Sequence, residues 1–250
     1  MFHADAPGGY LAPPPAPPRR HTRQVLAGVG ALLSVVVAAI AGVKLVGELT
    51  RSPTVAERNA AATREVAGRW QAWPVGKVFP PALPYTLDVG GTERARRVGI
   101  DPGAGCAAAV DPAIAATLRG HGCRGALRAT YLDQMQGLAI TVGVVAFPDE
   151  RSALSAKVRL PRTPGLRPLA LPGSVVARFT DAARQTSVAR QGGPYIVFAA
   201  IGYADGRPVA KIKQEQTDLY TIAPQLAEAV LAPLAQRSAV DCARKAVWSC

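Results

Sequence analysis

The longest apolar stretch of the chain lies near its N-terminus. Residues 25–43 carry no charged side chain, and the apolar character continues past Lys44 as far as Leu49. A helix needs roughly 20 such residues to cross the hydrocarbon core of a bilayer. The pattern therefore predicts a transmembrane helix over residues 25–47.

Charged residues before this stretch indicate its orientation. Arg19, Arg20 and Arg23 precede it directly, and positively charged flanks are retained on the cytoplasmic side of a membrane. We therefore expect residues 1–24 to form a cytoplasmic tail and the chain from residue 48 onward to lie outside the membrane.

A cleavable signal peptide is the competing interpretation of the same stretch. Ala39 and Ala41 form a small-x-small cleavage pattern, and Arg19-Arg20 could belong to a twin-arginine signal. However, the apolar run is longer than a usual signal core, and the residues after the arginine pair do not continue a twin-arginine pattern. An uncleaved anchor is the favoured interpretation.

Small residues recur at every fourth position of the predicted membrane helix and would share one face. They are Gly30, Ser34, Ala38 and Gly42. Because small residues at this spacing let two membrane helices approach closely, homodimerisation through this face is a hypothesis.

The tail and the first segment beyond the membrane differ in character. Six prolines among the first eighteen residues favour an extended, disordered tail. From Ser52 and Pro53, apolar side chains at three- and four-residue steps predict a helix as far as Trp73. A proline-rich connection follows, so residues 48–83 are expected to form a juxtamembrane helix and a linker.

Alternating patterns and turn residues predict the fold of residues 84–250. The expected strands are residues 85–89, 94–100, 126–132, 138–147, 187–190 and 195–203. The expected helices are residues 111–120, residues 149–158 and a last helix from about residue 221. Residues 138–147 are apolar on both faces and belong at the centre of a sheet. This order predicts an α+β domain, a mainly antiparallel sheet with packed helices.

The formal net charge of +12 first raises the possibility of nucleic-acid binding. The tail 1–24 holds only three of the 29 basic residues, so a net charge of +10 lies in or beyond the apolar segment. Nucleic acid is not the expected partner outside a membrane. Anionic lipid headgroups, anionic wall polymers or an envelope protein are the partners that this charge allows.

All four cysteines lie beyond the predicted membrane helix. They are Cys106, Cys123, Cys242 and Cys250. An even number of cysteines in an oxidising compartment indicates two disulfides. Three pairings are possible, and proximity along the chain favours Cys106 with Cys123 and Cys242 with Cys250.

Motifs for catalysis or for metal binding are missing from the sequence. There is no C-x-x-C, G-x-S-x-G, S-x-x-K, H-E-x-x-H or phosphate-binding glycine loop, and no cofactor is expected. A pair of His121 and Cys123 could act as base and nucleophile, but a thiol with a nearby cysteine would be oxidised in this compartment. The carboxylates at predicted turns and helix ends are Asp133, Asp149, Glu150, Asp205, Glu215 and Asp218.

Arginines in one predicted strand and one predicted loop form the candidate binding surface. They are Arg94, Arg96, Arg97, Arg159, Arg162 and Arg167. If strand and loop converge in the fold, these side chains could bind a polyanion.

Four short segments carry a resemblance to a known group of proteins. They are WPVGKVFP, RRVGIDPGAGCAAAV, GCRGALRATYLD and GYADGRP. Behind an N-terminal anchor they resemble uncharacterised single-pass membrane proteins of actinobacteria with a sensor-like extracytoplasmic domain, a likeness that spans about residues 25–237. The resemblance implies an envelope protein that binds a protein, wall polymer or lipid. A cell-wall or lipid-modifying enzyme is the alternative.

Overall fold

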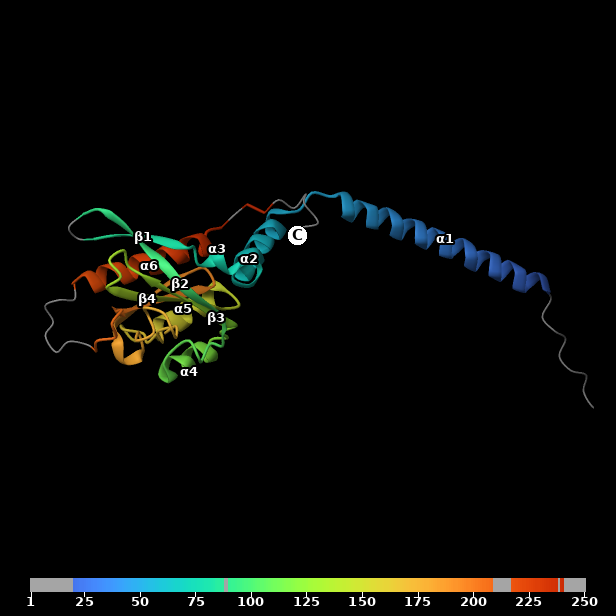
Figure 1. Ribbon diagram of the computed structural model, residues 1–250. Helices are drawn as coiled ribbons and strands as arrows, with labels where there is room; N and C mark the ends of the chain where they lie inside the picture. The colour runs from blue at the N-terminus through green and yellow to red at the C-terminus, as the bar shows by residue number, and fades with distance from the viewer. Residues whose placement is uncertain (1–19, 88–89, 209–216, 238, 241–250) are drawn as a thin grey trace, which may run out of the picture. The chain divides into compact units, whose positions relative to one another are not determined.

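The computed structural model describes residues 20–87, 90–208, 217–237 and 239–240, in two compact units, Met1–Pro53 and Thr54–Cys250. The first unit contains one long helix, α1 (Arg20–Thr50) (Figure 1). Within it, Gln24–Thr50 is long and apolar enough to cross a membrane, with a mean hydropathy of 2.4. Among the described residues it is the one helix with this property.

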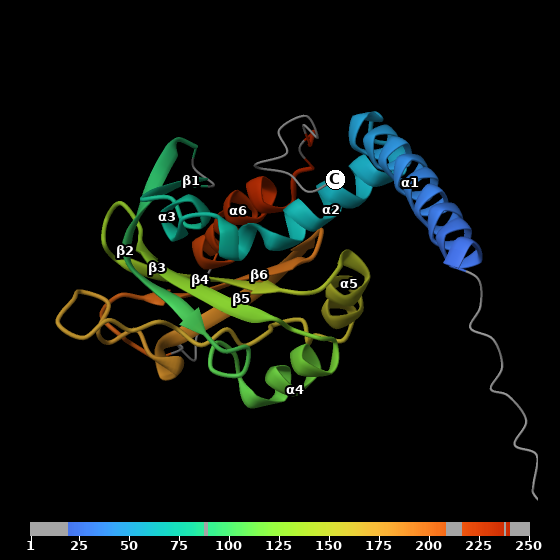
Figure 2. The same cartoon turned by 90° about the vertical axis from the view of Figure 1, so that its right-hand side faces the viewer.

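The second unit is built on one antiparallel sheet of six strands in the order β1-β2-β3-β4-β6-β5 (Figures 1 and 2). The strands are β1 (Ala82–Thr86), β2 (Thr92–Ala104), β3 (Gly125–Leu132), β4 (Leu138–Ala146), β5 (Arg184–Gly192) and β6 (Tyr195–Tyr203). The predicted α+β class is confirmed. β4 lies between β3 and β6, as its two apolar faces predicted.

Helices cover both faces of the sheet (Figure 2). They are α2 (Val55–Ala72), α3 (Val75–Val78), α4 (Pro112–Gly120), α5 (Glu150–Val158) and α6 (Thr217–Ala235), and a short 3-10 turn spans Asp181–Ala183. α2, α3 and α6 enclose one core cluster with the sheet, and α4 and α5 enclose another on the opposite face.

Alternation along the central strands supplies both clusters. Tyr195 and Val197 of β6 belong to the cluster under α6, whereas Ile196 and Phe198 belong to the cluster over α4 and α5. All four side chains are fully buried. Burying a large apolar side chain contributes about 1.5–3 kcal/mol, so the two-sided cover explains why apolar side chains lie on both faces of these strands.

α2 begins at Val55, after the N-cap Thr54, and not at the predicted Ser52 and Pro53. Hydrogen bonds of the Thr54 cap explain this start. The Thr54 hydroxyl accepts the Glu57 backbone N–H at 3.2 Å, and the Glu57 carboxylate accepts the Thr54 N–H at 2.8 Å. This reciprocal capping box satisfies two donors that the helix itself leaves unpaired.

The first hairpin also differs from the prediction. β1 begins at Ala82, three residues before the predicted start, because Leu83 and Tyr85 are buried while Pro84 between them is exposed. Proline is compatible with this position because β1 is an edge strand, where a missing N–H breaks no inner ladder. The glycines of the predicted turn, Gly90 and Gly91, both have positive φ.

Other boundaries differ because tertiary packing extends the elements. β2 and β5 are longer than expected, and α6 begins at Thr217 instead of near residue 221. The four-residue helix α3 lies in the segment predicted to be an irregular connection. It precedes Phe79, and the burial of Val78 and Phe79 in the core makes this segment part of the domain.

A buried arginine joins α2 to the end of α6. Arg69 is 3% exposed, and its guanidinium donates to both carboxylate oxygens of Glu65 at 2.8 and 2.6 Å. The same guanidinium donates to the carbonyls of Pro233, Leu234 and Gln236 at 2.9, 3.1 and 2.6 Å. The last carbonyls of a helix have no partner within the helix, so Arg69 completes the C-terminus of α6.

Part of the irregular segment between α5 and β5 belongs to the hydrophobic core. Val176 and Phe179 are fully buried against Leu132 of β3. The hydroxyl of Thr141 lies 2.8 Å from the hydroxyl of Thr130 and accepts the Leu169 backbone N–H at 2.9 Å. The predicted loop is therefore irregular but fixed to the sheet.

Asp111 was expected to cap α4, but its side chain makes no capping hydrogen bond. Its two oxygens instead accept Nη1 and Nη2 of Arg184 at 3.1 and 2.8 Å. Arg184 also donates to the Leu166 carbonyl at 2.8 Å. Such paired bonds between a guanidinium and a carboxylate fix geometry well, and here they join the start of β5 to the start of α4.

The predicted disulfide between Cys106 and Cys123 is present, with a Cα–Cα distance of 6.4 Å. It joins the chain after β2 to the chain after α4. Cys242 and Cys250, and with them the second predicted disulfide, lie outside the described residues, as does the proline-rich tail up to residue 19.

Candidate functional site

A surface hollow of about 900 Å³ lies where β1, β2 and the turn between β3 and β4 meet. Its lining residues are Pro81, Ala82, Thr92, Arg94, Arg96, Arg97, Val98, Leu132, Asp133, Gln134 and Gln136. Three of these residues are arginines and one is acidic, so the hollow is positively charged.

The register of β2 places two arginines side by side on one face of the sheet. Alternate residues of a strand point to opposite faces, and Ala95 is buried under α6. Arg94 and Arg96 therefore lie on the opposite face. Arg96 pairs across the sheet with Ala82 on one side and Leu132 on the other, so its small or apolar neighbours leave its guanidinium group exposed.

Neither of these two arginines has an ion-pair partner in the described part of the chain, and both are exposed. Arg97 differs. Its guanidinium donates to the Phe79 carbonyl, and its backbone N–H donates to the Pro81 carbonyl at 2.9 Å. Arg97 thus adds positive charge while it holds the chain before β1, and Arg94 and Arg96 are the groups available to a ligand.

The acidic residue of the lining serves the turn that carries it. Asp133 is 8% exposed, and its carboxylate accepts the Leu138 backbone N–H at 2.7 Å. Its backbone carbonyl accepts the Gln136 N–H at 3.2 Å. This second bond closes a turn in which Gln136 has a φ of 58°, a left-handed conformation that is unfavourable for a residue with a side chain. The turn therefore holds Gln136 at the rim of the hollow.

The structure brings together three of the six arginines in the predicted binding surface. Arg159 and Arg162 are exposed at and beyond the end of α5, and neither lines the hollow. Arg167 donates to Asp181 at 3.1 Å, and its backbone N–H donates to the Ala109 carbonyl. The candidate site consequently consists of Arg94, Arg96 and Arg97, without the three loop arginines.

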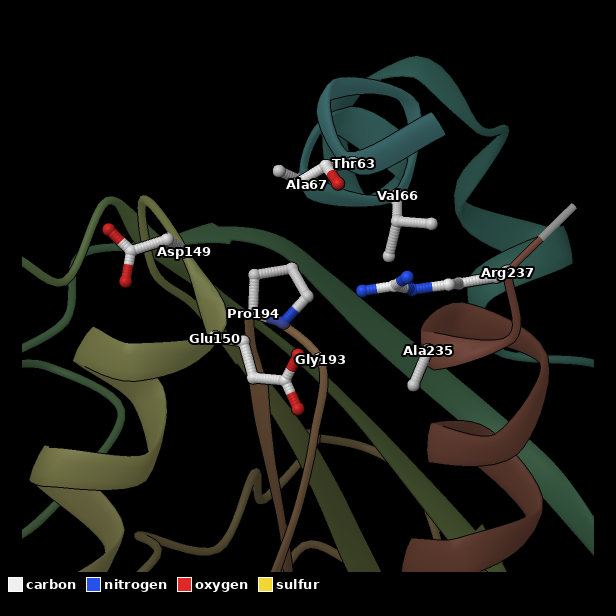
Figure 3. Close-up of a pocket in the computed structure, with 9 residues that line it drawn as sticks. All are labelled: Thr63, Val66, Ala67, Asp149, Glu150, Gly193, Pro194, Ala235 and Arg237. Atoms are coloured by element: carbon white, nitrogen blue, oxygen red, sulfur yellow. The ribbon is translucent and has the colours of Figure 1, made fainter. Parts of the chain in front are cut away.

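A second, smaller pocket of about 150 Å³ lies between α2, the first turn of α5, the β5–β6 turn and the end of α6 (Figure 3). Val66 of α2 and Pro194 form apolar parts of its wall, and the Arg237 side chain extends between them (Figure 3). Glu150 lies beside Pro194. The volume is below the range of about 300–1,000 Å³ that is usual for small-molecule sites.

Three of the carboxylates singled out from the sequence, Asp133, Asp149 and Asp205, make structural hydrogen bonds. Asp149 caps α5 by accepting the Ser152 N–H at 2.8 Å, which lowers the pKa of its carboxyl. Asp205 accepts the backbone N–H of Arg207 and pairs with its side chain, and these contacts lower the pKa of Asp205. Glu215 and the side chain of Asp218 lie outside the described part of the chain.

The proposed pair of His121 and Cys123 has no free thiol, because Cys123 is bonded to Cys106. His121 ends α4 as its C-cap. Within the residues that the structure describes, no group of three or more His, Cys, Asp and Glu side chains could hold a metal ion.

Buried phenols account for the largest pKa shifts. Burial raises the pKa of Tyr195 to about 12, and its hydroxyl donates to the Val66 carbonyl of α2. Burial likewise raises the pKa of Tyr85 and of Tyr131, whose hydroxyl donates to the Pro80 carbonyl at 3.0 Å. These groups fasten α2 and the chain around β1 to the sheet.

Sequence reasoning missed the polar groups that complete the hollow. Thr92, Gln134 and Gln136 lie beside the arginines only because the antiparallel register brings the start of β2 next to the end of β3. The predicted hairpins placed these residues at turns, but no local pattern indicated that the two turns share a surface.

Comparisons with protein-family models, with curated proteins and with solved structures found no match to this chain.

Proposed function

We propose that this is a single-pass membrane protein whose second unit lies outside the membrane and binds an anionic component of the cell envelope. The hollow around Arg94 and Arg96 is the observation that carries the proposal. Two exposed guanidinium groups on adjacent positions of one sheet face offer several N–H donors to phosphate or carboxylate oxygens, and such charge-assisted bonds are among the stronger hydrogen bonds in proteins.

Two further features support the location. α1 has the length and composition of a membrane anchor, and Arg19, Arg20 and Arg23 favour a cytoplasmic N-terminus. The disulfide between Cys106 and Cys123 is typical of an oxidising compartment. The likeness to sensor-like actinobacterial proteins, and a homodimer through the small residues of α1, stay predictions.

Binding can be tested with the full-length protein in nanodiscs of neutral phosphatidylcholine and with polyphosphate as the anionic probe. We expect Arg94→Gln with Arg96→Gln to weaken binding by about tenfold to a hundredfold, the effect of losing one or two charge-assisted bonds. The double variant Arg159→Gln and Arg162→Gln removes the same charge outside the hollow and should retain near wild-type affinity. Equal losses in both variants would show unspecific attraction to a basic surface.

A further inference from the structure

The polar groups around the two arginines indicate which anion the hollow accepts. Thr92, Gln134 and Gln136 line it together with Arg94 and Arg96. All three polar residues are exposed, and in the described part of the chain their side chains make no hydrogen bond of their own. Amide and hydroxyl groups both donate and accept hydrogen bonds, so they suit a ligand that carries hydroxyl groups beside its charges.

The size of the hollow indicates an extended ligand. Its volume of about 900 Å³ lies near the top of the range of about 300–1,000 Å³ that is usual for ligand sites. One phosphate or carboxylate group fills only a small part of this space. A ligand with several charged groups, interspersed with hydroxyls, would reach Arg94, Arg96 and the glutamines together.

The hollow lies at one end of the sheet of the second unit. The chain enters the second unit at Thr54, and α2 then packs beside the β5–β6 turn and the first turn of α5. The hollow lies at the other end of β4, beside the β3–β4 turn. Figure 2 shows α5 and the first turn of α2 at one end of the sheet, and the β1–β2 hairpin toward the other end.

These two ends are separated by the length of β4. Its nine residues span roughly 25–30 Å at about 3.3 Å per residue. The hollow is therefore remote from the point where the chain enters the unit.

We infer that the hollow binds a segment of a hydroxyl-bearing anionic polymer, of the polyol-phosphate or acidic-polysaccharide class, in preference to lipid headgroups. Arg94 and Arg96 bind the anionic groups, and Gln134, Gln136 and Thr92 bind the hydroxyls between them. This inference rests on the proposed function and specifies its ligand.

The test compares three probes with the full-length protein in phosphatidylcholine nanodiscs. Soluble poly(glycerol phosphate) supplies charge and hydroxyls, polyphosphate supplies charge alone, and phosphatidylglycerol vesicles present glycerol phosphate on a bilayer. We expect Gln134→Ala to weaken the binding of poly(glycerol phosphate) by about two- to tenfold, the effect of one lost neutral hydrogen bond. The affinity for polyphosphate should be unchanged, and the vesicles should compete weakly at equal phosphate concentration.

Different failures have different meanings. If Gln134→Ala changes neither affinity or lowers both equally, hydroxyl recognition is refuted while the anion site stands. If vesicles compete as well as the polymer and do so through Arg94 and Arg96, a lipid surface is the partner and the polymer inference falls. If no probe binds in a manner that depends on these two arginines, the proposed function itself falls.

Discussion

Replacing Arg69 with methionine should destabilise the second unit more than any other single arginine change among its described ion pairs. The substitution removes a buried cation, leaves the Glu65 carboxylate at 15% exposure without this partner, and removes a donor from three carbonyls at the end of α6. Breaking a buried ion pair by removing one partner costs about 3–5 kcal/mol. Total stabilities are about 5–15 kcal/mol, so the loss should be a large fraction of the whole.

The effect can be followed by thermal unfolding of the full-length protein in detergent, with near-ultraviolet circular dichroism or tryptophan fluorescence. Because 1 kcal/mol changes the Tm of a domain of this size by about 2–4 °C, we expect a decrease of roughly 6–20 °C. Arg167→Met is the matched control, since Arg167 and Asp181 are 49% and 45% exposed and such pairs contribute about 0–1 kcal/mol.

A second substitution separates the two sources of this loss. Glu65→Met in the Arg69→Met background removes the carboxylate that has lost its bond to Arg69 and should recover part of the stability, whereas the carbonyls of α6 stay without this donor. A decrease in Tm below about 3 °C for Arg69→Met, or a decrease equal to that of Arg167→Met, would refute the role assigned to Arg69.

Three further predictions follow from the described contacts. Cys106→Ser with Cys123→Ser should destabilise the unit by about 3 kcal/mol, because the disulfide closes a loop with a sequence separation of 17. The Tm of the wild type should fall by at least as much with reductant, and a reductant-insensitive Tm would contradict this. Burial raises the pKa of Tyr195 to about 12 in the folded state, above its usual value of 10.0. The contribution of Tyr195 to stability is therefore fully present below about pH 10 and is lost as the pH rises toward 12. Stability measured together with absorbance at 295 nm should decline only above pH 10, and a decline that begins near neutral pH would oppose the assignment. Gln136→Gly should raise stability by about 1 kcal/mol by relieving the left-handed conformation, and an unchanged or lower Tm would show that the Gln136 side chain stabilises its turn.

The hydrophobic pattern of the sequence predicts correctly those helices and strands that have the same kind of surroundings along their whole length. Gln24–Thr50 of α1 and strand β4 are apolar at nearly every position, and β4 is covered on both faces, so their patterns identify them directly. The capping box of Thr54 and Glu57 was also present in the sequence as T-x-x-E, and the more obvious Ser52-Pro53 pair obscured it.

Contacts between distant segments could not be read in the same way. The cover that Val176 and Phe179 provide comes from a segment with no helical or strand period. Whether an arginine is free or paired also depends on tertiary placement: Arg167 pairs with Asp181, Arg97 bonds the Phe79 carbonyl, and Arg94 is exposed. The sequence therefore indicated a basic surface but could not show which of the six arginines are exposed and which are bonded within the fold.

Arginine footprinting tests directly whether an anionic polymer binds at Arg94 and Arg96. The full-length protein in neutral nanodiscs is treated with a dicarbonyl reagent that modifies exposed guanidinium groups, with and without an anionic polymer, and the modified residues are identified by mass spectrometry. We expect the polymer to protect Arg94 and Arg96, whereas Arg159 and Arg162 should react equally in both samples. Equal protection of all four arginines, or protection of Arg159 and Arg162 alone, would contradict it.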